Sequence, residues 1–135
     1  KAQELSAIAK GECVPLVGDL ATIAGVEALA SHLAEREQHI DVLVNNAGLG
    51  TGGAFDKMSV VDWDRTMDIN TRSPLFLTQA LLGLLKARAT VDAPSSVIFI
   101  SSVAASEIFA HVMAYSTSKK GCRTLNAPDR ISAGR

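Results

Sequence analysis

Tyr115 and Lys119 are the residues of this sequence whose types and spacing most directly suggest chemistry. Tyr115 is the only tyrosine in the chain, and Lys119 follows it four residues later in the stretch YSTSK. Residues at positions i and i+4 share one face of a helix, so the lysine ammonium can lie beside the phenol oxygen. A nearby cation stabilises a phenolate and makes a phenol a better proton donor near neutral pH. A surface lysine that follows a tyrosine at the edge of the core would produce the same sequence pattern, so the pair alone is not specific for a catalytic site.

Two further polar residues could act with this pair. Ser102 ends the stretch IFISS, thirteen residues before Tyr115, and Asn70 stands in MDINT. A serine at the end of a strand can equally satisfy the backbone of the following loop, and asparagine is a good helix N-cap. Ser101 is the other candidate in IFISS, and because side chains alternate along a strand, it should point to the opposite face from Ser102. The spacing to Tyr115 favours Ser102.

The stretch NNAGLGTGG, residues 45–53, contains a formal G-x-G-x-x-G pattern. Such a pattern cradles phosphate when its glycines open a helix at once and direct free N–H groups at the ligand. Here the first credible helix cap after Gly53 is Ser59. We therefore interpret residues 45–53 as a loop at the carboxyl edge of the sheet, where ligands bind in open α/β folds and where glycine lets a ligand approach the backbone.

The hydrophobic pattern predicts short strands that alternate with helices, which indicates an α/β fold with a parallel sheet. Ser59 and Asp62 form a plausible capping box for a helix that carries Trp63, and Pro74 is tolerable only near the start of the next helix. Apolar residues on both faces predict strands covered by helices on each side. The predicted strands cover residues 13–17, 41–44 and 97–101, and the predicted helices cover residues 23–33, 59–67, 70–87 and 111–125, with the end of another helix over residues 1–10.

Composition excludes several classes of protein. The 135 residues carry a net charge of −1 without a Lys/Arg cluster, so we expect no nucleic-acid partner, and no apolar run is long enough to span a membrane. Cys13 and Cys122 lie far apart, as expected of ordinary thiols in a reducing compartment, and we expect a cytoplasmic protein. The three histidines, His32, His39 and His111, show no metal-ligand spacing, so no metal site is expected.

The segment VNNAG at residues 44–48, the pair Asp19-Leu20 and the later Tyr-x-x-x-Lys together resemble the short-chain dehydrogenase/reductase family over residues 1–125. The resemblance implies a doubly wound Rossmann fold and hydride transfer between NAD or NADP and a carbonyl or secondary alcohol. It also implies a role for each matching residue. Tyr115 would be the acid/base, and Ser102 would bind the carbonyl oxygen. Lys119 would activate the tyrosine and hold the nicotinamide ribose, and Asn70 would hold a helix kink and a proton-relay water. The adenosine part of the cofactor would be contacted by Asp19, Leu20, Asn46, Ala47 and Gly48.

Asp19 could alternatively be only the N-cap of the helix that starts near Ile23. The sequence as a whole most resembles the 3-oxoacyl-carrier-protein-reductase-like branch of the family, whose members act on many carbonyls. The choice between NAD and NADP and the substrate stay open. For a full-length protein the resemblance implies a homodimer or homotetramer that associates through the helices at residues 70–87 and 111–125.

The sequence also departs from the family pattern. The glycine-rich loop T-G-x-x-x-G-x-G is absent, and the helix after Gly121 breaks at Asn126-Ala127-Pro128. We therefore expect a central, incomplete part of the Rossmann fold over residues 1–125, followed by an aperiodic tail at 126–135. Two alternatives follow: a non-catalytic fragment that at most associates through its long helices, and an extended-type epimerase or dehydratase, which shares Y-x-x-x-K but usually differs at NNAG.

Overall fold

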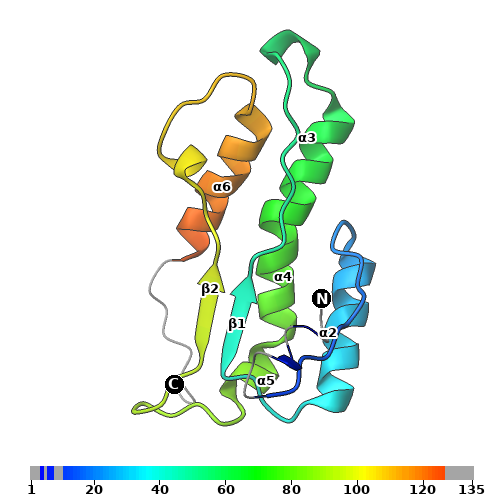
Figure 1. Cartoon of the computed structure of the whole chain (residues 1–135), viewed down its shortest axis with the longest axis vertical. Helices are drawn as coiled ribbons and strands as arrows, with labels where there is room; N and C mark the ends of the chain where they lie inside the picture. The colour runs from blue at the N-terminus through cyan, green and yellow to red at the C-terminus, as the bar shows by residue number, and fades with distance from the viewer. Residues whose placement is uncertain (1–3, 5, 8–10, 127–135) are drawn as a thin grey trace.

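The computed structural model describes residues 4, 6–7 and 11–126 of the chain. Figure 1 shows two short parallel strands side by side, with helices packed along them. The predicted helix end over residues 1–10 and the tail from residue 127 onward fall largely or wholly outside the described residues. The elements are α2 (Ile23–Arg36), β1 (Val42–Asn45), η1 (Phe55–Lys57), α3 (Val60–Met67), η2 (Asp68–Arg72), α4 (Ser73–Ala80), α5 (Leu82–Lys86), β2 (Ser96–Phe99), η3 (Val103–Ala105) and α6 (Met113–Leu125).

The predicted α/β class and the parallel pairing are confirmed. Strand β1 pairs with β2 in a register that places Val42 opposite Ser96 and Asn45 opposite Phe99. The core lies between one face of this sheet and the helices: Leu43 and Val97 pack against a buried cluster from α2, α4 and the segment through α5. The buried members of this cluster are Val26, Ala30, Leu77, Leu81 and Leu85.

The other face of the sheet is open, and the prediction that both faces are buried is wrong for the described residues. Val42, Val44, Ile98 and Ile100 are all exposed. Side chains alternate along a strand, so helices that cover the Leu43 face leave this second set uncovered. The apolar residues of the strands predicted a layer of helices on each face of the sheet, whereas the described residues form a helical layer on one face.

The strand predicted over residues 13–17 does not form. This segment has no regular structure in the described part of the chain. A strand is stabilised by hydrogen bonds to a neighbour. No neighbouring strand is present beside it among the described residues, and Pro15 could not donate to one.

Helix α2 forms as its apolar periodicity predicts, but Asp19 is not its N-cap. Thr22 holds that position, and its side chain accepts a hydrogen bond from the Gly25 N–H. Asp19 supports the preceding turn instead, because its carboxylate accepts from the Ala21 N–H and the Thr22 hydroxyl. Thr22 is the better placed of the two because it directly precedes the first helical residue.

The segment from Val60 to Lys86 is nearly continuous helix, interrupted by the π-turn η2 and by non-helical backbone angles at Leu81. Ser59 caps its start as predicted, by accepting from the Asp62 N–H. The Asp62 carboxylate accepts from the Ser59 hydroxyl, which differs from the bond to the backbone N–H that defines a capping box. Pro74 lies in the first turn of α4. Because proline has no N–H, it cannot donate to the carbonyl four residues earlier, that of Asn70. The π-turn and Pro74 therefore release Asn70 from regular helical bonding.

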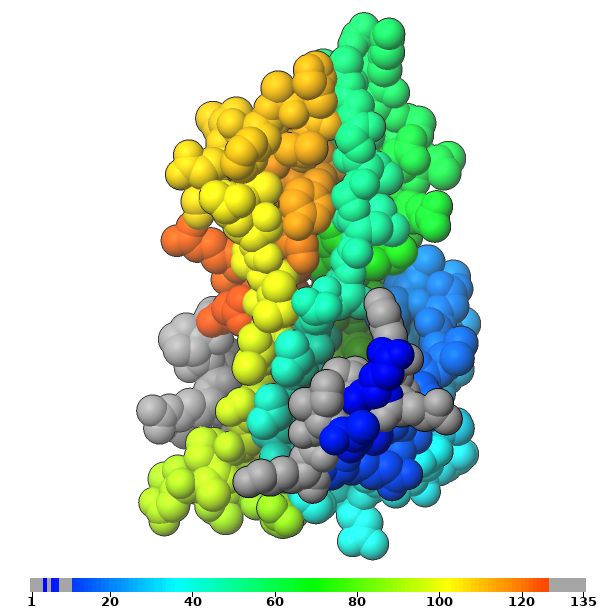
Figure 2. Space-filling model, viewed as in Figure 1, coloured from blue at the N-terminus to red at the C-terminus, as the bar shows by residue number. Residues whose placement is uncertain are grey.

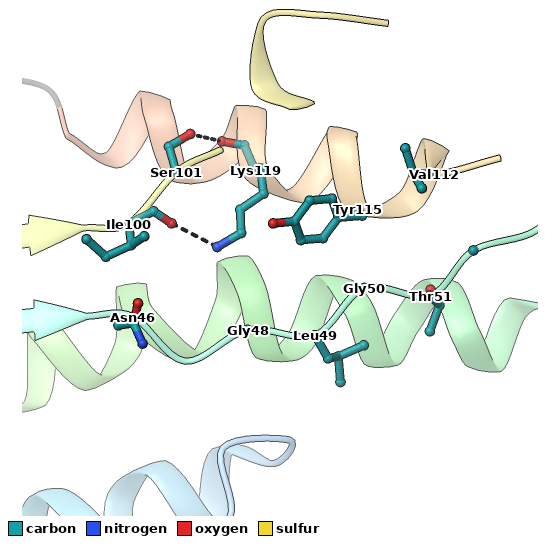
Figure 3. A pocket seen from close by; sticks show the side chains of 11 residues that line it. Asn46, Gly48, Leu49, Gly50, Thr51, Ile100, Ser101, Val112, Tyr115 and Lys119 are labelled. Atoms are coloured by element: carbon teal, nitrogen blue, oxygen red, sulfur yellow. Dashed lines mark hydrogen bonds between the residues drawn. The ribbon is translucent and has the colours of Figure 1, made fainter. Parts of the chain in front are cut away.

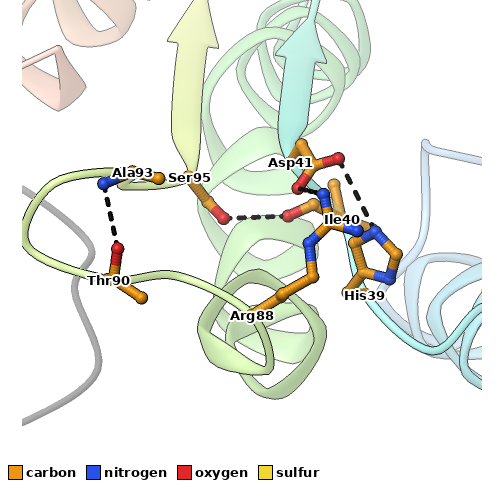
Figure 4. A network of polar contacts seen from close by, with 7 residues as sticks. All are labelled: His39, Ile40, Asp41, Arg88, Thr90, Ala93 and Ser95. Carbon is orange, nitrogen blue, oxygen red and sulfur yellow. Dashed lines mark hydrogen bonds and ion pairs between the residues drawn. The ribbon is translucent and has the colours of Figure 1, made fainter.

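Polar contacts close the amino ends of the two strands (Figure 4). The Ser95 hydroxyl donates to the Ile40 carbonyl at 3.0 Å, and this joins the loop before β2 to the residue before β1. His39 and Arg88 lie 3.6 Å and 3.5 Å from the Asp41 carboxylate. Since Asp41 and Arg88 are largely exposed, we ascribe little stability to these ion pairs.

Helix α6 docks against β2 at one end and against the π-turn along its length. At the β2 end, the Asn126 side-chain amide accepts from the Phe99 N–H and donates to the Phe99 carbonyl, at 3.1 Å and 2.8 Å. This amide therefore pairs with the outer edge of β2 as the backbone of another strand would. Along the π-turn, the Thr71 hydroxyl donates to the Ser118 carbonyl. A Cβ on Gly121 would lie 2.9 Å from the Thr71 methyl, so glycine permits this close approach.

We predict opposite effects of one substitution at two helical glycines. Gly121→Ala should lower the free energy of unfolding by about 1–2 kcal/mol, because overpacking against Thr71 outweighs the higher helix propensity of alanine. Gly83 of α5 has open space around its Cβ position, so Gly83→Ala should raise the free energy of unfolding by about 0.5–1 kcal/mol. Urea unfolding of both variants measures this. Equal shifts in the same direction would contradict the close contact at Gly121.

Candidate functional site

A cavity of about 490 Å³ lies between the glycine-rich loop after β1, the end of β2 and the first turns of α6. In Figure 2 the loop after β1 runs side by side with the segments that follow β2, and Figure 3 shows the side chains that line the cavity. This is the carboxyl edge of the parallel sheet, where the sequence predicted the loop to lie. The lining consists of Asn46, Gly48, Leu49, Gly50, Thr51, Gly52, Ile100, Ser101, Val112, Tyr115 and Lys119.

Tyr115 and Lys119 enter this cavity from the same face of α6. The Lys119 amine is 5.8 Å from the centre of the Tyr115 ring, and the lysine side chain is only 4% exposed. The amine donates to the Ile100 carbonyl at 2.8 Å, which fixes its position beside the end of β2. Figure 3 shows the phenol oxygen on the side of the ring nearer to this amine. The spacing of four residues thus brings the two groups together, while their catalytic role stays a prediction.

The glycines of the loop make room for these side chains. A Cβ on Gly48 would lie 3.3 Å from both the Lys119 amine and the Asn70 side-chain oxygen, and one on Gly50 would lie 3.4 Å from the Tyr115 ring. After Gly53 the chain forms the short turn η1 and then begins α3 at Val60. Since no helix opens at these glycines, the structure offers no helical N–H groups there for a phosphate.

Asn70 is not an N-cap, because helical backbone precedes and follows it. Its side-chain amide instead pairs with the backbone of Leu49: the oxygen accepts from the Leu49 N–H at 2.9 Å, and the nitrogen donates to the Leu49 carbonyl at 2.7 Å. The same nitrogen donates to the Ser118 hydroxyl at 2.8 Å. Asn70 therefore ties the loop after β1 to α6, a role that local sequence spacing did not reveal.

The two serines at the end of β2 have different partners. Ser101 lines the cavity, and its hydroxyl donates to the Lys119 backbone carbonyl at 3.0 Å. Ser102 is outside the lining, and its hydroxyl accepts from the Ala104 N–H as the cap of η3. The alternation predicted for neighbouring serines is thus realised. Ser102 makes the loop contact that was its alternative role, and its place in a reaction remains a prediction.

The residues predicted to contact the adenosine part of a cofactor are only partly gathered. Asn46 and Gly48 line the cavity, whereas Ala47 between them is exposed and does not. Asp19 lies in the turn before α2 and Leu20 packs against the hydrophobic core. Sequence reasoning missed Thr51, whose hydroxyl pairs with that of Thr66, and Val112, whose position three residues before Tyr115 could have suggested it.

The cavity fits one part of a nicotinamide dinucleotide better than another. Among its polar groups, the Lys119 amine and the Asn46 side chain suit the hydroxyls of a ribose, and its volume lies in the range of small-molecule sites. A pyrophosphate needs a glycine-rich turn at a helix N-terminus, and the described residues contain none on this cavity. The residues present therefore fit a ribose and not a pyrophosphate. Asn46 and Gly48 were expected at the adenosine part, but they share this cavity with Tyr115 and Lys119, the residues expected at the nicotinamide end.

Within the described residues, no three of His, Cys, Asp and Glu are grouped so that they could hold a metal ion. Over the same part of the chain, no helix combines the length and hydrophobicity that crossing a membrane requires.

Comparison with known proteins identifies relatives of the chain. The profile of the family described as short chain dehydrogenase matches residues 1–127. The chain is 40% identical over 118 residues to the sepiapterin reductase of Chlorobaculum tepidum, which covers 87% of this chain and 47% of that protein. It is 37% identical over 119 residues to the rhamnolipids biosynthesis 3-oxoacyl-(acyl-carrier-protein) reductase of Pseudomonas aeruginosa, covering 87% and 46%. The solved Pseudomonas aeruginosa RhlG/NADP active-site complex matches with a TM-score of 0.85 and 37% identity over 92% of this chain and 48% of that chain.

The chain thus spans about half the length of the relatives it matches. Its two parallel strands and their helices correspond to part of their α/β fold.

Cys122 offers a direct test of how closely α6 packs against the π-turn. Burial raises the pKa of this thiol, although the nearby Lys119 charge acts in the opposite direction. Because the folded thiol keeps its proton to higher pH than the unfolded thiol, its contribution to the free energy of unfolding is complete at low pH, where the thiol is protonated in the folded and in the unfolded chain. This contribution falls once the unfolded thiol ionises near pH 8.5. We predict that the free energy of unfolding, relative to that of Cys122→Ser, decreases as pH rises above about 8.5.

The second thiol is an internal control for reactivity. Cys13 is partly exposed and Cys122 is buried. Iodoacetamide at pH 8 should therefore modify Cys13 in the folded chain and reach Cys122 only in denaturant, as mass spectrometry of peptides would show. Equal modification of both thiols in the folded chain would contradict the packing of α6.

Proposed function

Because this chain belongs to the short-chain dehydrogenase family, we propose that it carries the catalytic centre of an oxidoreductase that acts on a carbonyl or secondary alcohol with NAD or NADP. The observation that carries the proposal is the meeting of Tyr115 with the buried Lys119 amine in one cavity at the carboxyl edge of the sheet. A phenol and an ammonium in such a place can move a proton to or from a substrate oxygen. The complete domain is needed for turnover, since this chain covers about half of its relatives.

In the proposed reaction, side chains of this chain move the proton and stabilise the charge that develops. In reduction, the Tyr115 hydroxyl donates its proton to the oxygen of the substrate carbonyl as negative charge develops there. The Lys119 ammonium stabilises the phenolate that remains. Ser102 lies at the end of β2 outside the cavity lining, and its hydroxyl, which accepts from the Ala104 N–H, would turn its own hydrogen toward the substrate oxygen. Asn70 keeps the loop after β1 against α6 and so holds the cavity in shape. In the reverse direction the phenolate accepts the proton from an alcohol.

The cofactor supplies the hydride when it is bound, and the protein binds and orients it. Lys119 and Asn46 would hold its nicotinamide ribose, with Gly48 allowing close approach, while Asp19 and Leu20, at the turn before α2, would lie toward its adenine. The named relatives are reductases, and one solved relative is an NADP complex, which supports a nicotinamide cofactor and a small carbonyl substrate. Association of full-length subunits through α4 and α6 belongs to the same proposal.

A second possibility is that the 135-residue chain is itself inactive and at most associates through its long helices. The open sheet face supports it, because Val42, Val44, Ile98 and Ile100 together form exposed apolar surface. The lack of a phosphate-binding turn in the described residues supports it as well. This chain would then show no turnover although a complete domain containing the same residues does.

Replacing Tyr115 tests its role as the acid. In a full-length protein that contains this segment, Tyr115→Phe should lower carbonyl reduction by at least about 100-fold, because the ring remains but the exchangeable proton is gone. Affinity for the cofactor, measured by fluorescence titration, should stay close to that of the parent. Turnover at the parental rate would remove Tyr115 from this role.

Cofactor titration separates the chain from the complete domain. We predict that isothermal titration of the 135-residue chain with NADPH or NADH gives no binding in the micromolar range, since the groups present fit only one end of the dinucleotide. The full-length protein serves as the positive control. Micromolar binding by the short chain would show that residues 1–135 suffice for the cofactor.

A further inference from the structure

Helix α6 presents two neighbouring pairs of residues with the same spacing. Tyr115 and Lys119 face the cavity, whereas Ser118 and Cys122 face the π-turn η2. The Cys122 thiol donates a hydrogen bond to the Asn70 backbone carbonyl, to which Pro74 cannot donate because it has no N–H. Ser118 contacts the side chain of the same asparagine. One face of α6 therefore carries the proposed chemistry, and the adjacent face holds Asn70 by its backbone and by its side chain.

Ser118 is completely buried, and its hydroxyl has two partners. It donates to the Tyr115 backbone carbonyl at 2.7 Å and accepts from the Asn70 amide nitrogen at 2.8 Å. The first contact is common, because a serine within a helix often bonds the carbonyl three residues earlier. The second joins a different element across 48 positions of sequence. It is this second contact that distinguishes Ser118 from an ordinary helical serine.

The donors and acceptors fix the direction of every bond in this chain of contacts. A carbonyl can only accept, so the Ser118 hydrogen points at Tyr115 and its oxygen must accept from Asn70. The Asn70 nitrogen then faces Ser118 and the Leu49 carbonyl, and the Asn70 oxygen faces the Leu49 N–H. With the amide turned over, the Ser118 and Leu49 oxygens would each face an acceptor. The Leu49 backbone therefore sets the orientation of the Asn70 amide, and the Ser118 oxygen accepts the amide N–H that does not bond to the loop.

We infer that Ser118 is a positioning residue, whose hydroxyl holds the Asn70 amide and through it keeps Leu49 and Gly48 against Lys119. The inference rests on the proposed function, because the loop and the lysine matter as parts of the same catalytic cavity. The backbone at Gly48 passes close to both groups, since a Cβ there would lie 3.3 Å from the Asn70 side-chain oxygen and from the Lys119 amine. Without the Ser118 oxygen, one buried N–H of Asn70 and the Tyr115 carbonyl each lose a partner, and buried polar groups left unpaired are costly.

The chain contains a matched control on the same helix. The Ser116 hydroxyl oxygen is buried and has no hydrogen-bond partner among the described residues. Ser116→Ala removes the same atom from the same helix without breaking a contact. Differences between Ser118→Ala and Ser116→Ala therefore report the hydrogen bonds of Ser118 and not the loss of a hydroxyl as such.

The first measurement needs no enzyme activity. Hydrogen exchange of the Leu49 amide, followed by NMR in the 135-residue chain, should become about 10-fold faster in Ser118→Ala, because the acceptor on Asn70 is no longer held in place. Ser116→Ala should leave the rate unchanged. Should Ser118→Ala fail to fold, Ser118→Cys keeps a weak donor and acceptor and should give an intermediate rate. Exchange at the parental rate in a folded Ser118 variant would overturn the inference.

The second measurement uses a full-length protein that contains this segment. Ser118→Ala should lower kcat about 10-fold with little change in KM, and should shift the pH profile of kcat, because the lysine beside Tyr115 loses its fixed surroundings. Ser116→Ala should match the parent in both. If the parent catalyses no reduction but Leu49 exchange still responds to Ser118→Ala, the proposed function fails and the positioning role stands. If the parent is active and neither measurement responds, the positioning role fails alone.

Discussion

The site depends on a carbonyl that its own helix does not satisfy in the regular way. Proline at position 74 has no N–H to donate to the carbonyl of Asn70, and the backbone around Asn70 widens into a π-turn. Such turns place a side chain where a regular helix would not. Here the result is that Asn70 lies buried between two other elements, with its amide on the loop after β1 and its carbonyl against α6. Asn70 thereby joins three segments of the chain, namely the π-turn, the loop after β1 and α6.

The surroundings of Lys119 follow from the same arrangement. Lys119 is buried, yet its amine donates to the neutral Ile100 carbonyl and not to a carboxylate. A buried cation held by a carboxylate would be largely neutralised, whereas one held by a carbonyl keeps its positive charge available to its neighbours. Tyr115 is the ionisable group that faces it in the cavity. The charge of the lysine also acts on the Cys122 thiol on the adjacent face of α6, whose pKa it lowers against the larger effect of burial.

The parts of the molecule that depend on local spacing were predictable from sequence. The capping of α3 by Ser59, the apolar stripe of α2 and the shared face of Tyr115 and Lys119 each involve residues within a few positions of one another. The parts that failed depend on distant partners. Residues 13–17 have the composition of a strand but no strand beside them within residues 11–126. The pairing of Asn70 with Leu49 joins residues 21 positions apart. That Ser101 and Ser102 point to opposite faces was predictable, but not that Ser101 bonds to the Lys119 carbonyl and Ser102 to the Ala104 N–H.

The Asn126 amide has a consequence for how the sheet could grow. It already occupies the outward N–H and carbonyl of Phe99, so a further strand arriving beside β2 would exchange hydrogen bonds at that position and not add new ones. The last turn of α6 would have to release its side chain first. Enlargement of the sheet on this side is therefore coupled to the ending of the helix, and until that release occurs the amide shields this position of the edge from chance pairing with other chains.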